Sequence, residues 1–126
     1  MAIDNKYLYS EITDKIIELA IKVHKTLGPG FIEKFYEKAL IFEFSKNNVE
    51  YVIQKTINVK YGDLLLGIQR IDLVVENKVI VELKVVSEIN DINVAQIVSY
   101  LKASGFKIGL VLNFAKNKLE IKRIIT

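Results

Sequence analysis

Residues 68–86 read IQRIDLVVENKVIVELKVV, and this stretch decides how the rest of the chain can fold. Two apolar runs flank a polar break at residues 76–78, a pattern that predicts a β-hairpin. Three charged residues lie inside the apolar runs: Asp72 in the first, and Glu82 and Lys84 in the second. Because burying a charge is costly unless it is paired, each of them needs a partner or a function.

Side-chain alternation places Glu82 and Lys84 on the same face of the second strand. A hairpin that turns around Asn77 brings Asp72 level with Glu82 on the neighbouring strand. Two carboxylates so close repel each other unless a cation lies between them. Oxygen ligands without cysteine favour a hard ion, so the pattern predicts an Mg²⁺ or Mn²⁺ site at Asp72 and Glu82. Lys84 would orient water there or stabilise charge on a phosphate.

The E-x-K spacing of residues 82–84 is weak evidence by itself, because it recurs at residues 76–78 and 120–122. Only the copy at 82–84 lies within a strand-like run and follows a strand that carries an acidic residue. The alternative is an ordinary strand whose charged side chains point to solvent. The residues alone leave both interpretations open.

Composition favours a single domain over residues 1–126, since 51% of the residues are hydrophobic and 26% are charged, as in ordinary globular proteins. The absence of cysteine excludes disulfides, thiol nucleophiles and cysteine-based zinc sites. A net charge of +3 permits contact with a phosphate backbone without demanding it. No signal-peptide pattern and no apolar run of bilayer length is visible, so we expect a cytoplasmic protein without a membrane segment.

Two helices are predicted before the hairpin. Apolar residues spaced by three or four predict a helix over residues 9–27, capped by Ser10 and ended by Gly28. A second helix begins just after Gly30 and stops near residues 47–48. Residues 9–48 are therefore predicted to be mainly helical.

Strands and a third helix make up the rest. Residues 49–61 alternate as a strand with one irregularity at Lys55. A third helix at 91–104, a strand at 107–115 and a last strand at 119–125 follow. The order helix, helix, three strands, helix, two strands predicts an α/β or α+β fold, a mixed β-sheet flanked by helices. The apolar final strands could also pair between chains, which would give a homodimer.

Several polar residues have ordinary explanations as well as functional ones. Glu33 falls in the first turn of the second helix, where the helix dipole stabilises a carboxylate. Gln96 and Tyr100 lie on a flank of the third helix that could face the site or the solvent. His24 lies in the last turn of the first helix, where packing or the helix dipole explains it better than catalysis does.

Residues 30–36, GFIEKFY, contain the pattern G-x-x-E-x-x-Y, and the chain resembles the GxxExxY protein family. Further motifs of that family follow in the same order: VHKTLGPG at 23–30, RIDLVV at 70–75, VIVELK at 79–84, AQ at 95–96 and YLKA at 100–103. The family is identified as a member of the PD-(D/E)xK nuclease-like superfamily. The resemblance therefore implies a restriction-endonuclease-like core and a metal-dependent phosphodiesterase site.

The resemblance also implies a role for five residues. Asp72 and Glu82 would be the metal ligands, and Lys84 the catalytic lysine. Glu33 would be the helical acidic residue that adds to the metal site. Gln96 would be the helical polar residue that orients water or substrate.

The predicted function is that of an Mg²⁺-dependent nuclease, a hydrolase acting on nucleic acid phosphodiesters, with DNA expected rather than RNA. One alternative is a non-catalytic nucleic-acid-binding or protein-interaction module on the same fold. Another is a structural domain in which the hairpin charges form a buried ion pair. Ile71 stands where the superfamily pattern has proline, a substitution common in that superfamily, and it does not decide among the three.

Overall fold

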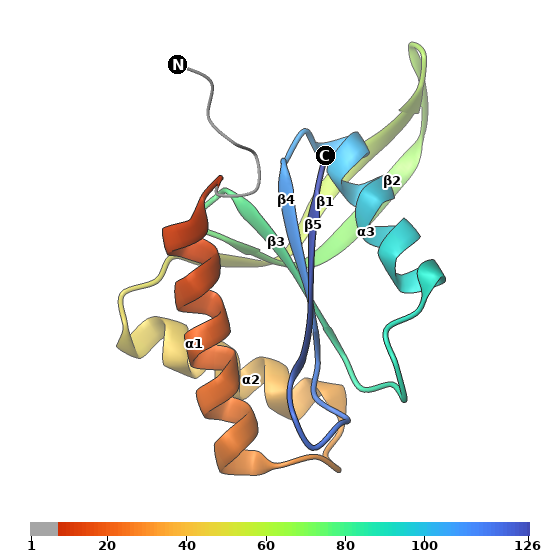
Figure 1. Ribbon diagram of the computed structural model, residues 1–126. Helices are drawn as coiled ribbons and strands as arrows, with labels where there is room; N and C mark the ends of the chain where they lie inside the picture. The colour runs from red at the N-terminus through yellow and green to blue at the C-terminus, as the bar shows by residue number, and fades with distance from the viewer. Residues whose placement is uncertain (1–7) are drawn as a thin grey trace.

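A computed structural model describes residues 8–126 (Figure 1). The elements in chain order are α1 (Ser10–Leu27), α2 (Glu33–Lys46), β1 (Tyr51–Tyr61), β2 (Leu64–Val75), β3 (Val79–Lys84), α3 (Asp91–Ser104), β4 (Ile108–Asn113) and β5 (Glu120–Ile125). This is the predicted order. The predicted class, a mixed sheet flanked by helices, is confirmed.

A tight turn joins β2 to β3. The N–H of Lys78 donates to the carbonyl of Val75 over 3.0 Å, and the two residues between them, Glu76 and Asn77, both have a φ of 53°. These two left-handed residues reverse the chain within a three-residue loop, 76–78, which leaves Val75 opposite Val79. The polar break in the sequence is therefore the turn itself.

The turn fixes the register of the hairpin. Leu73 pairs with Val81 across the two strands. One step further along this register, Asp72 comes level with Glu82. The predicted alignment of the two acidic residues therefore follows from the turn.

The sheet has the strand order β1-β2-β3-β4-β5. β3 and β4 run parallel, joined through α3, whereas the other neighbouring strands are antiparallel. Every residue of β4 is buried, as predicted for a strand covered on both faces. At Gly109 of β4 an added Cβ would lie 2.6 Å from Cγ2 of Ile97, so glycine permits α3 to lie close against the sheet.

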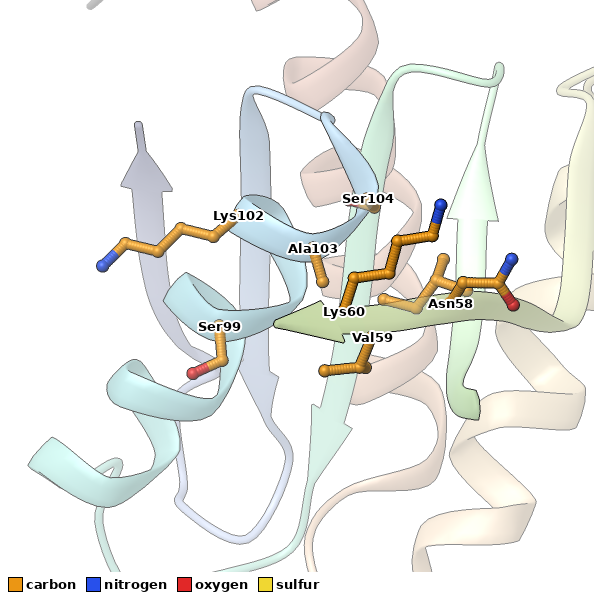
Figure 2. A pocket seen from close by; sticks show the side chains of 8 residues that line it. Asn58, Val59, Lys60, Ser99, Lys102, Ala103 and Ser104 are labelled. Carbon is orange, nitrogen blue, oxygen red and sulfur yellow. The ribbon is translucent and has the colours of Figure 1, made fainter. Parts of the chain in front are cut away.

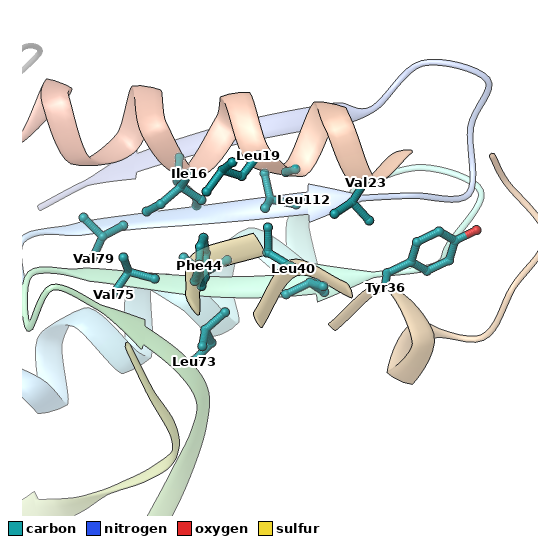
Figure 3. Packing of buried hydrophobic residues seen from close by; sticks show 14 of the residues in the cluster. Ile16, Leu19, Val23, Tyr36, Leu40, Phe44, Leu73, Val75, Val79 and Leu112 are labelled. Atoms are coloured by element: carbon teal, nitrogen blue, oxygen red, sulfur yellow. The ribbon is translucent and has the colours of Figure 1, made fainter. Parts of the chain in front are cut away.

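Helices cover both faces of the sheet, in three layers. On one face, α1 and α2 bury the apolar residues Ile16, Leu19, Val23, Tyr36, Leu40 and Phe44 against the strands (Figure 3). On the other face, α3 buries Ile97, Tyr100 and Leu101 against the strands. The part of the hairpin from Ile71 to Lys84 is therefore mostly enclosed between layers, whereas the first half of β2 is exposed.

Two local predictions were wrong. Ser10 does not cap α1, because the capping position is Tyr9, which has a φ of 55° and makes no side-chain cap hydrogen bond. The register shift in β1 does not lie at Lys55 but between Val59 and Lys60. Hydrophobic periodicity reveals neither irregularity, which lies one residue away at the start of α1 and four to five residues away in β1.

The β1–β2 hairpin extends past the other strands as an arm (Figure 1). Its far end exposes five large apolar side chains: Tyr61, Leu64, Leu65, Leu66 and Ile68. β5, from the region where pairing between chains was predicted, is indeed an edge strand, but the one large hydrophobic residue it exposes is Ile121. The homodimer therefore remains a prediction. The end of the arm exposes more large hydrophobic residues than β5 does.

Candidate metal centre

Asp72 and Glu82 meet where β2 and β3 lie side by side. Glu82 is 4% exposed and Asp72 is half-buried. The carboxylate of Glu82 accepts a hydrogen bond from the backbone N–H of Asp72. The two acidic residues that the hairpin pattern singled out are therefore neighbours in space.

The regular alternation of β2 is interrupted at Asp72. Ile71 is buried in the cluster beneath α3, whereas Leu73, two residues on, is buried in the cluster beneath α1 and α2. Across the strand pair, Gln54 of β1 lies between the partners of these two residues and has a φ of 53°. Irregularities of this kind re-aim side chains next to functional sites, and here one coincides with the carboxylate that a metal would use.

The carboxylate of Glu82 is strongly perturbed. Burial, which removes water from the charged form, and the negative charge of Asp72 together raise the pKa of Glu82 to about 7. Lys84 acts in the opposite direction, with its Nζ 4.0 Å from Oε2 of Glu82. The effect of Lys84 on the pKa of Glu82 is smaller than the combined effect of burial and Asp72. The negative charge of the two carboxylates is therefore only partly compensated.

Glu33 approaches the same group from the start of α2. Burial raises its pKa, Lys84 lowers it, and Asp72 raises it again. These interactions place Glu33 within electrostatic reach of the hairpin residues. The structure thus brings together four of the five predicted residues: Glu33, Asp72, Glu82 and Lys84.

Gln96 is not brought into this group. Its side chain is exposed on α3, and it forms no hydrogen bond with any residue of the described chain. One turn later, Tyr100 is buried and accepts a hydrogen bond at its hydroxyl from Nε2 of Gln69 over 3.2 Å. Burial and the charges of Glu82 and Asp72 raise the pKa of Tyr100, which places its hydroxyl near both carboxylates.

Sequence reasoning missed Gln69 and gave Tyr100 no role. Gln69 is one of several polar residues in β2, and nothing in its neighbourhood along the chain distinguishes it. Its contact with Tyr100 depends on how α3 packs across the sheet. For Tyr100 the one available signal was its position one turn after Gln96.

Asn113 fixes the chain where it leaves the site. This side chain, at the end of β4, is fully buried. Its Nδ2 donates to the carbonyl of Val86 over 2.8 Å and to Oε1 of Glu120 over 2.9 Å, and its Oδ1 accepts from the N–H of Val86 over 3.1 Å. Because Asn113 also pairs with Lys84 across the parallel strands, these bonds hold the segment directly after the lysine.

Tyr36, the last residue of the G-x-x-E-x-x-Y pattern, is structural. Its hydroxyl donates to the carbonyl of Gly28 over 2.6 Å and accepts from the N–H of Phe31 over 3.2 Å. Its ring stacks on Phe114 with centroids 4.6 Å apart, and Figure 3 shows its hydroxyl at the end of the core cluster. The tyrosine therefore sets where α2 begins, and with it the position of Glu33.

Tyr36→Phe is expected to lower the free energy of unfolding by about 1 kcal/mol, since it removes the hydroxyl that bonds the partly buried carbonyl of Gly28 and the N–H of Phe31. Urea denaturation measures this. Tyr51→Phe is the matched control, because the hydroxyl of Tyr51 contacts Ser45 at an exposed position. Equal stability of Tyr36→Phe and the parent would contradict the positioning role.

His24, the single histidine, contacts other parts of the chain. Its Nε2 lies 2.7 Å from the carbonyl oxygen of Lys116, and its ring lies 6.0 Å from that of Phe114. These contacts tie the end of α1 to the segment between β4 and β5. These contacts agree with the predicted packing role of His24.

The chemistry of the donor set fits a hard divalent cation. A buried carboxylate beside a second one, with too little positive charge nearby, is the arrangement that such an ion relieves. Within residues 8–126 no three acidic, histidine or cysteine side chains lie close enough to form a complete metal site. An ion at Asp72 and Glu82 would therefore keep several waters, as Mg²⁺ commonly does.

A groove of about 700 Å³ lies between β1 and α3 (Figure 2). Lys60 and Lys102 stand on its two sides, and their side chains extend away from each other. Ser99, which also lines the groove, is the neighbour of Tyr100. The groove is thus a lysine-flanked surface that does not contain the carboxylates.

A family model described as the PD-(D/E)XK nuclease superfamily matches residues 10–124, which include every residue of the candidate metal centre. No curated protein and no solved structure matches the chain. Across residues 8–126, none of the helices combines the length and the apolar character needed to cross a bilayer.

Proposed function

The chain belongs to the PD-(D/E)XK nuclease superfamily, and from this premise we propose that residues 1–126 form a single-domain, metal-dependent nuclease that hydrolyses phosphodiester bonds in DNA. One observation carries the proposal: the nearly inaccessible carboxylate of Glu82 lies beside Asp72, with Lys84 Nζ 4.0 Å away. A purely structural strand would gain nothing from this costly arrangement.

Asp72 and Glu82 are the residues that would hold the cation, Mg²⁺ or Mn²⁺. Such an ion, when bound, neutralises phosphate charge and makes a coordinated water more acidic. Glu33 adds a third carboxylate on the side of α2, where it can accept a hydrogen bond from a water that the two ligands leave exposed. We call Asp72, Glu82 and the nearby Glu33 the acidic centre, of which the first two would be the ligands.

Lys84 supplies the positive charge that the protein itself contributes. Its side chain is 22% exposed, so its ammonium group reaches solvent while its stem is packed. From that position it stabilises the extra negative charge that develops on a phosphate as the attacking oxygen bonds to phosphorus. A fixed donor of this kind acts most strongly where water is partly excluded.

The other hydrogen-bonding groups approach the centre from α3. The hydroxyl of Tyr100, held by Gln69, can donate to a phosphate oxygen or to a water near the carboxylates. Gln96, one turn before it and exposed, is placed to contact substrate rather than the protein. A phosphate backbone that continues past Tyr100 would meet Lys60 and Lys102 in the adjacent groove.

The test is a cleavage assay on labelled single- and double-stranded DNA and RNA, with Mg²⁺, with Mn²⁺ and with EDTA. We expect cleavage of DNA with either ion and none with EDTA, because the carboxylates need the cation. An Asp72→Asn protein purified in the same way serves as the blank. A thermal melt gives a second readout, since a bound ion stabilises the folded state of the parent protein.

Three results would contradict the proposal. Cleavage that persists in EDTA would remove the need for a metal. Nucleic-acid binding without any cleavage, unchanged in Asp72→Asn, would favour the non-catalytic module. An unchanged melting temperature on adding Mg²⁺ would point the same way.

A further inference from the structure

The outer face of α2 carries a feature that the acidic centre does not explain. Phe31, Phe35 and Phe42 are 43%, 51% and 60% exposed. With Lys38 they follow one another at intervals of four, three and four residues, so they lie along one side of the helix and its entry. We call Phe31, Phe35, Lys38 and Phe42 the aromatic stripe.

The stripe is exposed because α2 turns a different side inward. Tyr36, Leu40 and Phe44 are fully buried against the sheet and α1, so the phenylalanines of the stripe face the opposite way. Exposed phenylalanine rings forgo the free energy of burial. A contiguous set of them marks a surface that binds something.

The charges along this side of α2 are positive. Lys38 and Lys46 are exposed and form no ion pair within the described part of the chain, and Nζ of Lys46 lies 5.4 Å from the centre of the Phe42 ring. The acidic residues of the helix are used elsewhere: Glu37 and Glu43 are buried and pair with lysines at 3.5 Å and 3.0 Å. Rings interleaved with ammonium groups suit a polyanion with flat, stackable faces.

The stripe shares α2 with Glu33 but lies on another side of the helix. Glu33, which interacts electrostatically with Asp72 and Lys84, lies two residues before Phe35, a spacing at which helical side chains point in different directions. The rings of Phe31 and Phe35 are 6.0 Å apart. At a rise of about 1.5 Å per residue, the helix carries the stripe about 10 Å further to Phe42, the length of roughly three stacked nucleotides.

We infer that the aromatic stripe binds an unpaired nucleic-acid strand, its bases on the phenylalanine rings and its phosphates near the lysines, and that this strand reaches the acidic centre around the start of α2, where Glu33 lies. This inference rests on the proposed nuclease function and narrows its substrate to nucleic acid with a single-stranded segment. A paired base presents no free face to a ring, so duplex DNA gains little from the stripe.

Fluorescence anisotropy tests the inference. The full chain is titrated in EDTA against a labelled single-stranded DNA of about 12 nucleotides, and against a duplex of the same sequence. Removing both rings in Phe35→Ala/Phe42→Ala is expected to weaken single-strand binding at least about tenfold and to change duplex binding less than about twofold. Phe35→Tyr/Phe42→Tyr keeps the aromatic faces and should bind as the parent does.

The lysine contribution is read from salt dependence. Lys38→Gln should reduce the slope of log K against log salt by about 0.7, the value for one phosphate contact on a single strand. Ile92→Ala is the matched control for the double-alanine variant, because it also removes an exposed apolar side chain. Ile92 is 78% exposed on α3, away from the stripe. The Ile92→Ala protein should bind the single strand as tightly as the parent does.

Equal single-strand affinity in the double-alanine variant and the parent would overturn the inference. So would equal losses for single strand and duplex. Sedimentation of the parent as a dimer that the double-alanine variant dissociates would show that a second copy covers the stripe. Since binding is measured without metal, these outcomes are distinct from an absence of Mg²⁺-dependent cleavage, which bears on the nuclease proposal alone.

Discussion

Lys84→Ala is expected to lower the rate of Mg²⁺-dependent cleavage by about 10²- to 10³-fold, the usual cost of removing one fixed donor from a developing anionic charge. The loss should appear in kcat, because the ammonium group stabilises the transition state more than the bound substrate. Single-turnover cleavage at saturating enzyme measures this step directly. The affinity for Mg²⁺ should not fall, since the lysine opposes the ion electrostatically.

Lys78→Ala is the matched control for this variant. Lys78 belongs to the other E-x-K triplet of the same hairpin, at residues 76–78, but it is exposed in the turn. The Lys78→Ala protein should cleave the substrate at the parent rate. A Lys84→Ala protein that cleaves as fast as the parent, with an unchanged circular dichroism spectrum, would refute the assigned role.

Glu82→Gln is expected to raise the stability of the metal-free protein at pH 8 by an amount on the order of 3 kcal/mol. The folded-state pKa of Glu82 is raised to about 7 from an ordinary value of 4.5. Between pH 4.5 and 7 the folded protein therefore holds a proton that the unfolded chain has released. Stability falls as pH rises through this window, and above pH 7 the full cost of an ionised, buried carboxylate remains.

Urea denaturation in EDTA between pH 5 and pH 8 measures this effect. The parent should lose stability across the range, and Glu82→Gln should lose much less, with a smaller slope left by Glu33, whose pKa is also raised. Glu88→Gln, at an exposed position, should follow the parent. Added Mg²⁺ should stabilise the parent but not Glu82→Gln. A variant less stable than the parent at pH 8 would mean that the carboxylate is not under strain.

The residues closest to the hairpin turn were the ones that the sequence could predict. A hairpin centred on Asn77 leaves one register, so the meeting of Asp72 and Glu82 followed from local rules. The burial of β4 and its parallel pairing followed equally from an apolar run after a helix. In these cases the sequence neighbours determine the structure.

Contacts between elements far apart in the chain could not be predicted in this way. Gln69 meets Tyr100 only because α3 lies close to the sheet at Gly109, and no periodicity encodes that distance. α2 is apolar on several sides, so its pattern did not show that Phe42 faces outward. Gln96 was named by family resemblance, and the packing of α3 leaves its side chain exposed.

The amide of Asn113 has a consequence for how a cation would enter and leave. Its bonds to Val86 and Glu120 brace the chain beside Lys84 with protein groups alone. The scaffold around the acidic pair is thus assembled before any ion arrives, unlike small domains that fold only around their metal. Chelation should accordingly switch the protein off without unfolding it, and restoring the ion should return activity at once, with no refolding delay.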